Sequence, residues 1–134
     1  PVMMQCVSGY GSTIVEGEAR IDRSFVATEN ANHKADHAVV GALVCRTWRM
    51  APALVAAVRL HHDLPTLGQR GVEPEVQTLV AAGLIAEHLM RRIEGLPADR
   101  EWKDHCAAAM EWLSIEPTDL EVWEPEIQLV FDSL

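Results

Sequence analysis

The chain has 134 residues, 49% of them hydrophobic and 23% charged, a composition typical of one globular domain with a single core. Its 20 acidic and 11 basic residues give a formal charge of −9, which repels phosphate backbones and argues against nucleic-acid binding. The longest apolar runs, at 38–45 and 79–86, have eight residues each. Crossing a bilayer takes about 18 to 20 apolar residues, so we expect no membrane span.

The three cysteines, Cys6, Cys45 and Cys106, lie far apart and form no C-x-x-C motif. This pattern indicates free thiols in a reducing compartment, and we therefore expect a cytoplasmic location. The first residue is Pro1 rather than Met, which leaves open that the chain is a fragment of a longer protein.

Residues 1–30 carry the weakest pattern of the chain. Gly9, Gly11 and Gly17 interrupt the start, and only residues 16–29 have the composition of a helix. We therefore expect a poorly defined N-terminal segment at 1–30 and a helical core at 31–134, together forming one domain.

From residue 36 the helical pattern is clear. One helical face collects His37, Val40, Gly41, Val44 and Trp48, which predicts a helix over 36–50 with Trp48 in the core. Glycine is unfavourable inside a helix by about 1 kcal/mol, so a close helix–helix contact is expected at Gly41.

A second helix is expected over 52–62, because Pro52 suits a first helical position. A loop at 63–74 follows, and then helices over 74–95, 100–113 and 116–131. No segment alternates as a strand would. We therefore expect an all-α bundle of five to six helices.

Residues 36–63, "DHAVVGALVCRTWRMAPALVAAVRLHHD", resemble a segment of the HDOD family, bacterial signalling domains related to the HD superfamily of metal-dependent phosphohydrolases. Unlike residue types recur in the family's order and spacing: His37, Gly41, Trp48, Pro52, His61 and His62. The resemblance extends over about residues 30–125, the C-terminal half of such a domain. It implies an HD-superfamily-like helical fold and a regulatory role.

His37, His61 and His62 are the candidate metal ligands. Active HD relatives, the resemblance implies, also carry a His-Asp pair upstream of His37 and an aspartate in a later helix. No His-Asp pair precedes residue 36, and Ala82-Gly83 stands at the later position. We therefore expect a vestigial site with no cofactor, or with a divalent transition metal at low occupancy. In the structural alternative, the three histidines only complete helix ends.

These observations favour a non-catalytic signal-transduction module of HDOD type that acts through protein partners and forms a homodimer. The alternative is a metal-dependent phosphohydrolase, a phosphodiesterase that uses His37, His61 and His62. A third hypothesis is a helical dimerisation domain with neither site nor ligand.

The C-terminal segment is the candidate interface. Its apolar strip comprises Trp112, Trp123 and Phe131, with Val130 beside them. Six acidic residues and no basic one lie between Glu116 and Leu134, which suits a basic partner; packing on the bundle and a solvated acidic face are the alternatives. The remaining histidines, His33, His88 and His105, are expected at the surface or in packing contacts.

Overall fold

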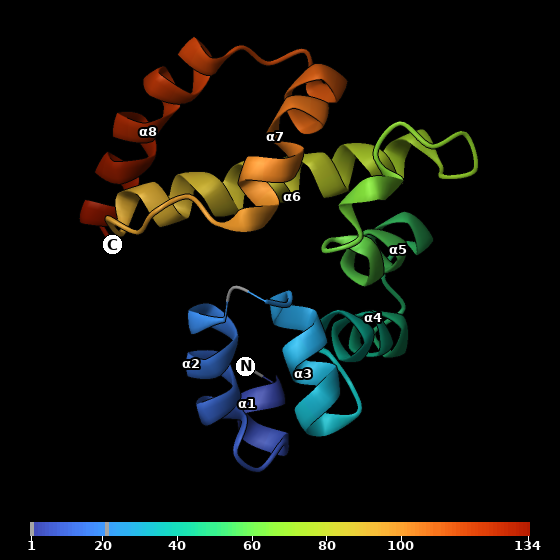
Figure 1. Cartoon of the computed structure of the whole chain (residues 1–134). Coiled ribbons are helices and arrows are strands. Elements are labelled where there is room, and N and C mark those ends of the chain that lie inside the picture. Colours follow the sequence, from blue (N-terminus) through green and yellow to red (C-terminus); the bar gives the residue numbers. More distant parts are fainter. Residues whose placement is uncertain (1, 21) are drawn as a thin grey trace. The chain divides into compact units, whose positions relative to one another are not determined.

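The structure, a computed structural model, describes residues 2–20 and 22–134. All its regular elements are helical, which confirms the all-α prediction, but these residues form eight α-helices and one short 3-10 helix rather than five or six helices (Figure 1). The chain divides into two compact units, Pro1–His62 and Asp63–Leu134. That both belong to one domain stays a prediction.

The first unit contains α1 (Val2–Cys6), α2 (Tyr10–Ala19), α3 (Phe25–His33), α4 (His37–Thr47) and α5 (Pro52–Leu60). The second contains η1 (Leu64–Thr66), α6 (Pro74–Ile93), α7 (Arg100–Leu113) and α8 (Pro117–Asp132). The helices predicted from residue 36 onward therefore all exist, and their boundaries differ from the expected ones by at most three residues.

The prediction for the N-terminal residues was wrong. Two helices, α2 and α3, stand where one was expected over 16–29, and α1 precedes them. The break follows from Ser24, whose side chain accepts a hydrogen bond from the Ala27 N–H and so begins a new helix. Gly17 does not interrupt α2: it lets Phe25 of α3 approach, since a Cβ there would lie 2.7 Å from the Phe25 ring.

Small residues bring α4 and α5 together. Ala38 and Ala42 of α4 and Ala57 of α5 are buried, and the two helices lie side by side. A Cβ on Gly41 would lie 3.0 Å from Val58 Cγ1, which confirms the close contact expected at this glycine. Trp48, expected in the core, is 71% exposed, because α4 ends at Thr47 and the predicted helical face does not continue past it.

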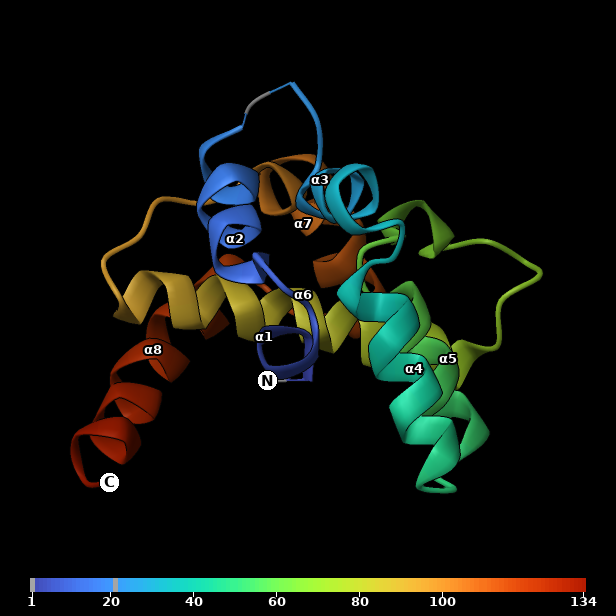
Figure 2. The same ribbon diagram turned by 90° about the horizontal axis from the view of Figure 1, so that it is seen from below.

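The second unit has an apolar core between α6 and its two partner helices. Ile85 and Leu89 of α6 and Leu120 of α8 are buried together, and half-buried side chains of α7 and α8 pack around them. Figure 2 shows that α8 diverges from α6 toward the C-terminal end of α8.

None of the helices in residues 2–20 and 22–134 combines the length and the apolar content that a transmembrane helix needs.

Candidate metal centre

Helix ends position the three histidines within the first unit. Asp36 begins α4 by accepting a hydrogen bond from the Val39 N–H at 2.9 Å, which places His37 at the first helical position. The other Asp36 oxygen accepts from the Asn30 side chain at 2.7 Å. Burial acts the other way, but these two hydrogen bonds lower the pKa of Asp36. His61 and His62 follow the last residue of α5.

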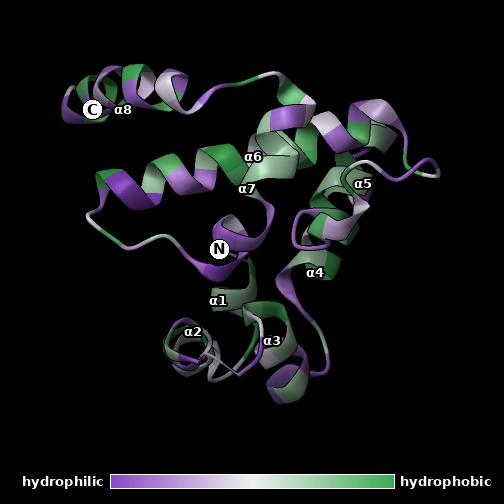
Figure 3. Ribbon diagram, turned by 45° about the horizontal axis from the view of Figure 1, so that its top comes forward, coloured by the Kyte–Doolittle hydropathy of each residue, from purple (hydrophilic) through white to green (hydrophobic). Residues whose placement is uncertain are grey.

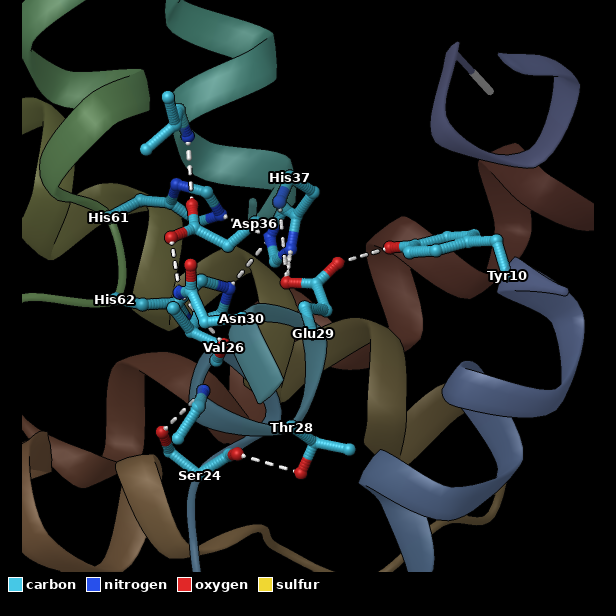
Figure 4. A network of polar contacts seen from close by, with 12 residues as sticks. Tyr10, Ser24, Val26, Thr28, Glu29, Asn30, Asp36, His37, His61 and His62 are labelled. Carbon is cyan, nitrogen blue, oxygen red and sulfur yellow. Dashed lines mark hydrogen bonds and ion pairs between the residues drawn. The ribbon is translucent and has the colours of Figure 1, made fainter. Parts of the chain in front are cut away.

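The three imidazoles converge on one point (Figure 4). His37 Nε2 lies 3.0 Å from His61 Nε2 and 2.9 Å from His62 Nε2. One nitrogen from each ring falls within 4.8 Å of the other two, and all three side chains are half-buried. The structure thus brings together all three predicted ligands, which come from segments 24 and 25 residues apart.

A buried carboxylate supports this cluster, and the sequence reading missed it. Glu29 of α3 is fully buried, and its Oε2 lies 2.7 Å from His37 Nδ1. The same oxygen accepts a longer hydrogen bond, 3.3 Å, from the His37 backbone N–H. Tyr10 of α2 donates its hydroxyl to Glu29 Oε1. Burial, then this hydrogen bond, then the nearby carboxylate raise the pKa of Tyr10 above its ordinary value.

The hydrogen bonds of the Nδ1 atoms of His37 and His61 determine which of their nitrogens can bind a cation. His61 Nδ1 lies 2.6 Å from the Val58 carbonyl oxygen, which can only accept, so this nitrogen carries the hydrogen. His37 Nδ1 donates to the Glu29 carboxylate in the same way. In their neutral forms the two rings therefore point Nε2 lone pairs at each other across 3.0 Å. Such an arrangement needs a bridging proton or a metal cation.

The spacing suits a metal with short bonds to nitrogen. Zinc–imidazole bonds of about 2.0–2.1 Å place tetrahedral ligand nitrogens about 3.3 Å apart. The separations of His37 Nε2 from the Nε2 atoms of His61 and His62, 3.0 and 2.9 Å, are each a few tenths of an ångström shorter than this spacing. A carboxylate on the far nitrogen of a ligand histidine is the usual support for such a site.

The other candidate residues do not join this cluster. Among the described residues, the three histidines form the one group at metal-ligand spacing. Gly83 lies in α6 and offers no ligand. His33 contacts Thr13 Oγ1 at 2.7 Å, and His88 stacks on Trp102 with ring centroids 3.6 Å apart, so both make packing contacts.

The predicted interface residues have different surroundings in the second unit. Trp112 of α7 donates its indole N–H to Thr78 Oγ1 at 3.0 Å. Trp123 packs against the buried core, and Phe131 is 43% exposed. Their role as an interface stays a prediction.

Comparison with protein families identified a matching domain. The profile of the HDOD domain matches residues 1–64, the segment that holds all three histidines, Glu29 and Tyr10. The match begins earlier than the resemblance at 30–125 predicted and ends just after His62. Neither the comparison with curated proteins nor that with solved structures found a match.

Proposed function

We propose that the chain is a non-catalytic regulatory module of HDOD type, the HD-related signalling family whose profile matches residues 1–64, and that its three histidines bind one divalent transition metal ion. The observation that carries this proposal is the convergence of the His37, His61 and His62 Nε2 atoms, with the Nδ1 atoms of His37 and His61 committed to acceptors.

The ligand chemistry favours a borderline or soft cation. Imidazole suits Zn²⁺, Ni²⁺, Cu²⁺ and Co²⁺, whereas Mg²⁺ and Ca²⁺ prefer oxygen ligands. A bound ion would link the start of α4 to the end of α5, and Glu29 and Tyr10 extend this link to α3 and α2. Because an ion that binds only the folded state stabilises it, metal availability would control how firmly the first unit is folded. Such coupling is a regulatory property that needs no turnover.

The nearby carboxylates support a binding role over a catalytic one. Both carboxylate oxygens of Glu29 accept hydrogen bonds, from Tyr10 and His37. Both oxygens of Asp36 do so too, from the Val39 N–H and the Asn30 side chain. A two-metal hydrolase needs carboxylates that bridge its ions, whereas these hydrogen bonds hold both acids on other partners. Protein partners and a homodimer belong to the same proposal, and sedimentation of the chain over a hundredfold concentration range tests the dimer.

The test is the metal content of tag-free protein that has never met a nickel column, measured by inductively coupled plasma mass spectrometry. We expect about one ion per chain in the native protein and none in the His61→Ala/His62→Ala double variant. His105→Ala, which removes a histidine of α7 outside the cluster, is the matched control and should keep the metal. Equal substoichiometric metal in all three proteins would contradict the proposal.

A metal-dependent phosphohydrolase is the second candidate, because Glu29 places an acid in contact with His37 as that hypothesis requires. It predicts metal-dependent cleavage of a phosphodiester such as bis-p-nitrophenyl phosphate, lost in His37→Ala. If metal-loaded protein binds one ion per chain yet cleaves no faster than the His37→Ala variant, the binding role is supported and the hydrolase is excluded for that substrate class.

A further inference from the structure

An apolar groove lies between α6, α7 and α8 in the second unit. Its volume is about 470 Å³. Its lining includes Ile85 and Leu89 of α6 and Leu113 of α7, and α8 contributes a wall of Trp123 and Ile127. Every side chain that lines it is hydrophobic. Ala82 and Ala86 of α6 also line it and are exposed, so the groove is open to solvent.

The apolar wall continues beyond the groove along α8. Helical spacing puts Val130 and Phe131 on the same face as Trp123 and Ile127, about one turn beyond Ile127 and two turns beyond Trp123. Val130 is 59% exposed and Phe131 43% exposed. Figure 2 shows this end of α8 projecting away from α6, and Figure 3 shows hydrophobic bands on both helices. An elongated apolar surface of this kind fits a helix better than a compact ligand.

Charge identifies the kind of helix. The second unit holds 15 of the 20 acidic residues and 5 of the 11 basic ones, a formal charge of −10, whereas the first unit is at +1. On α8, Glu126 is exposed beside Ile127, and Glu124 on the opposite edge of the apolar face pairs with Arg92 at 2.5 Å. The groove is therefore lined by apolar side chains and belongs to a strongly acidic unit.

We infer that this groove binds an amphipathic helix of a partner protein whose polar face carries lysine and arginine. In this mode of recognition, apolar side chains at i, i+3, i+4 and i+7 enter a hydrophobic groove. Basic residues on the partner would meet the acidic surface, which speeds association and sets specificity.

Other occupants fit the charge or the lining less well. A second copy would bring one −10 unit against another, and an anionic membrane would be repelled for the same reason. A small ligand would need a few convergent polar groups to orient it, and no polar side chain lines the groove.

The test uses the full chain and a dye-labelled helical peptide of about 18 residues, or five turns, built from leucine and lysine with the leucines on one face. One control peptide has the same composition with the leucines on all faces. Another has glutamate in place of lysine. We expect fluorescence anisotropy to show the amphipathic lysine peptide binding at least about tenfold more tightly than either control, and more weakly as salt rises.

Two matched variants locate the binding site on the protein. Ala86→Arg introduces a long basic side chain at the groove and should weaken binding of the lysine peptide about tenfold or more. Ala108→Arg makes the same charge change at an exposed alanine of α7 outside the groove and should alter it less than about twofold. Circular dichroism confirms that both variants are folded.

Several results would overturn the inference. Equal binding of the two lysine peptides would mean that charge alone attracts them, and equal affinity of Ala86→Arg and native protein would place binding elsewhere. If the native protein forms a dimer that Ala86→Arg dissociates, the occupant of the groove is a second copy of the chain. If the native protein binds vesicles and Ala86→Arg abolishes this binding, the occupant is a membrane. The inference adds a partner surface to the proposed signalling role but is independent of the metal: the His61→Ala/His62→Ala variant should bind the peptide as the native protein does.

Discussion

Replacing Glu29 with glutamine removes a buried charge while keeping the size and shape of the side chain. The carboxylate accepts hydrogen bonds from the Tyr10 hydroxyl and from His37 Nδ1, and a longer one from the His37 backbone N–H. If metal binding depends on His37 presenting its Nε2 lone pair to the cluster, weakening the acceptor on Nδ1 should weaken the metal site as well as the fold.

The expected magnitude follows from these contacts. A hydrogen bond to a charged group contributes about 1.5–3 kcal/mol, and one between neutral groups about 0.5–1.5 kcal/mol. Glu29→Gln turns the bonds from Tyr10 and His37 into bonds to a neutral acceptor and should lower the free energy of unfolding by about 2 kcal/mol. Loss of the charged support on a ligand histidine typically costs about 10- to 100-fold in metal affinity.

Urea unfolding followed by circular dichroism measures the first effect, and competition with a chromophoric zinc chelator measures the second. Glu18→Gln is the matched control, because it makes the same charge change at an exposed position of α2. Tyr10→Phe removes one donor to the buried carboxylate and should lower the free energy of unfolding by about 1.5–3 kcal/mol. If Glu29→Gln behaves like Glu18→Gln in both assays, the carboxylate does not hold His37, and the account of the site fails.

Three further predictions concern packing and titration, and urea unfolding measures each. Gly17→Ala should destabilise the protein by about 1–3 kcal/mol, because the new Cβ would meet the Phe25 ring at 2.7 Å. Gly83→Ala, in open space within α6, should stabilise it by about 0.5–1 kcal/mol. Equal effects of the two substitutions would contradict the close packing of Phe25 on Gly17. Trp48→Ala should change the free energy of unfolding by less than about 0.5 kcal/mol, because the side chain is 71% exposed. A larger loss of stability would indicate that Trp48 is a core residue after all. Burial lowers the pKa of His88 below its ordinary 6.5, so the unfolded chain binds this proton more readily than the folded one. The free energy of unfolding should therefore fall as the pH drops below 6.5. His88→Phe should make this pH dependence less steep, and an unchanged pH dependence would assign it to other groups.

Local sequence was enough for the helices after residue 36. Apolar periodicity, proline at first helical positions and Gly95 after α6 mark their boundaries, because these signals act over one or two turns. The same signals placed His37 at a helix start and His61 and His62 at a helix end. The N-terminal helices were missed because glycine reads as a helix breaker when its packing partner is unknown, and Phe25 is that partner for Gly17.

Long-range packing decided the rest of the candidate site. Glu29 lies eight residues before His37 on another helix, and Tyr10 lies 19 residues before Glu29, so no short spacing rule pairs them. The groove likewise depends on how α8 packs against α6, which the apolar pattern of either helix leaves open. Periodicity states which face of a helix is apolar, but only the tertiary structure determines which segment covers that face and which part of it stays exposed.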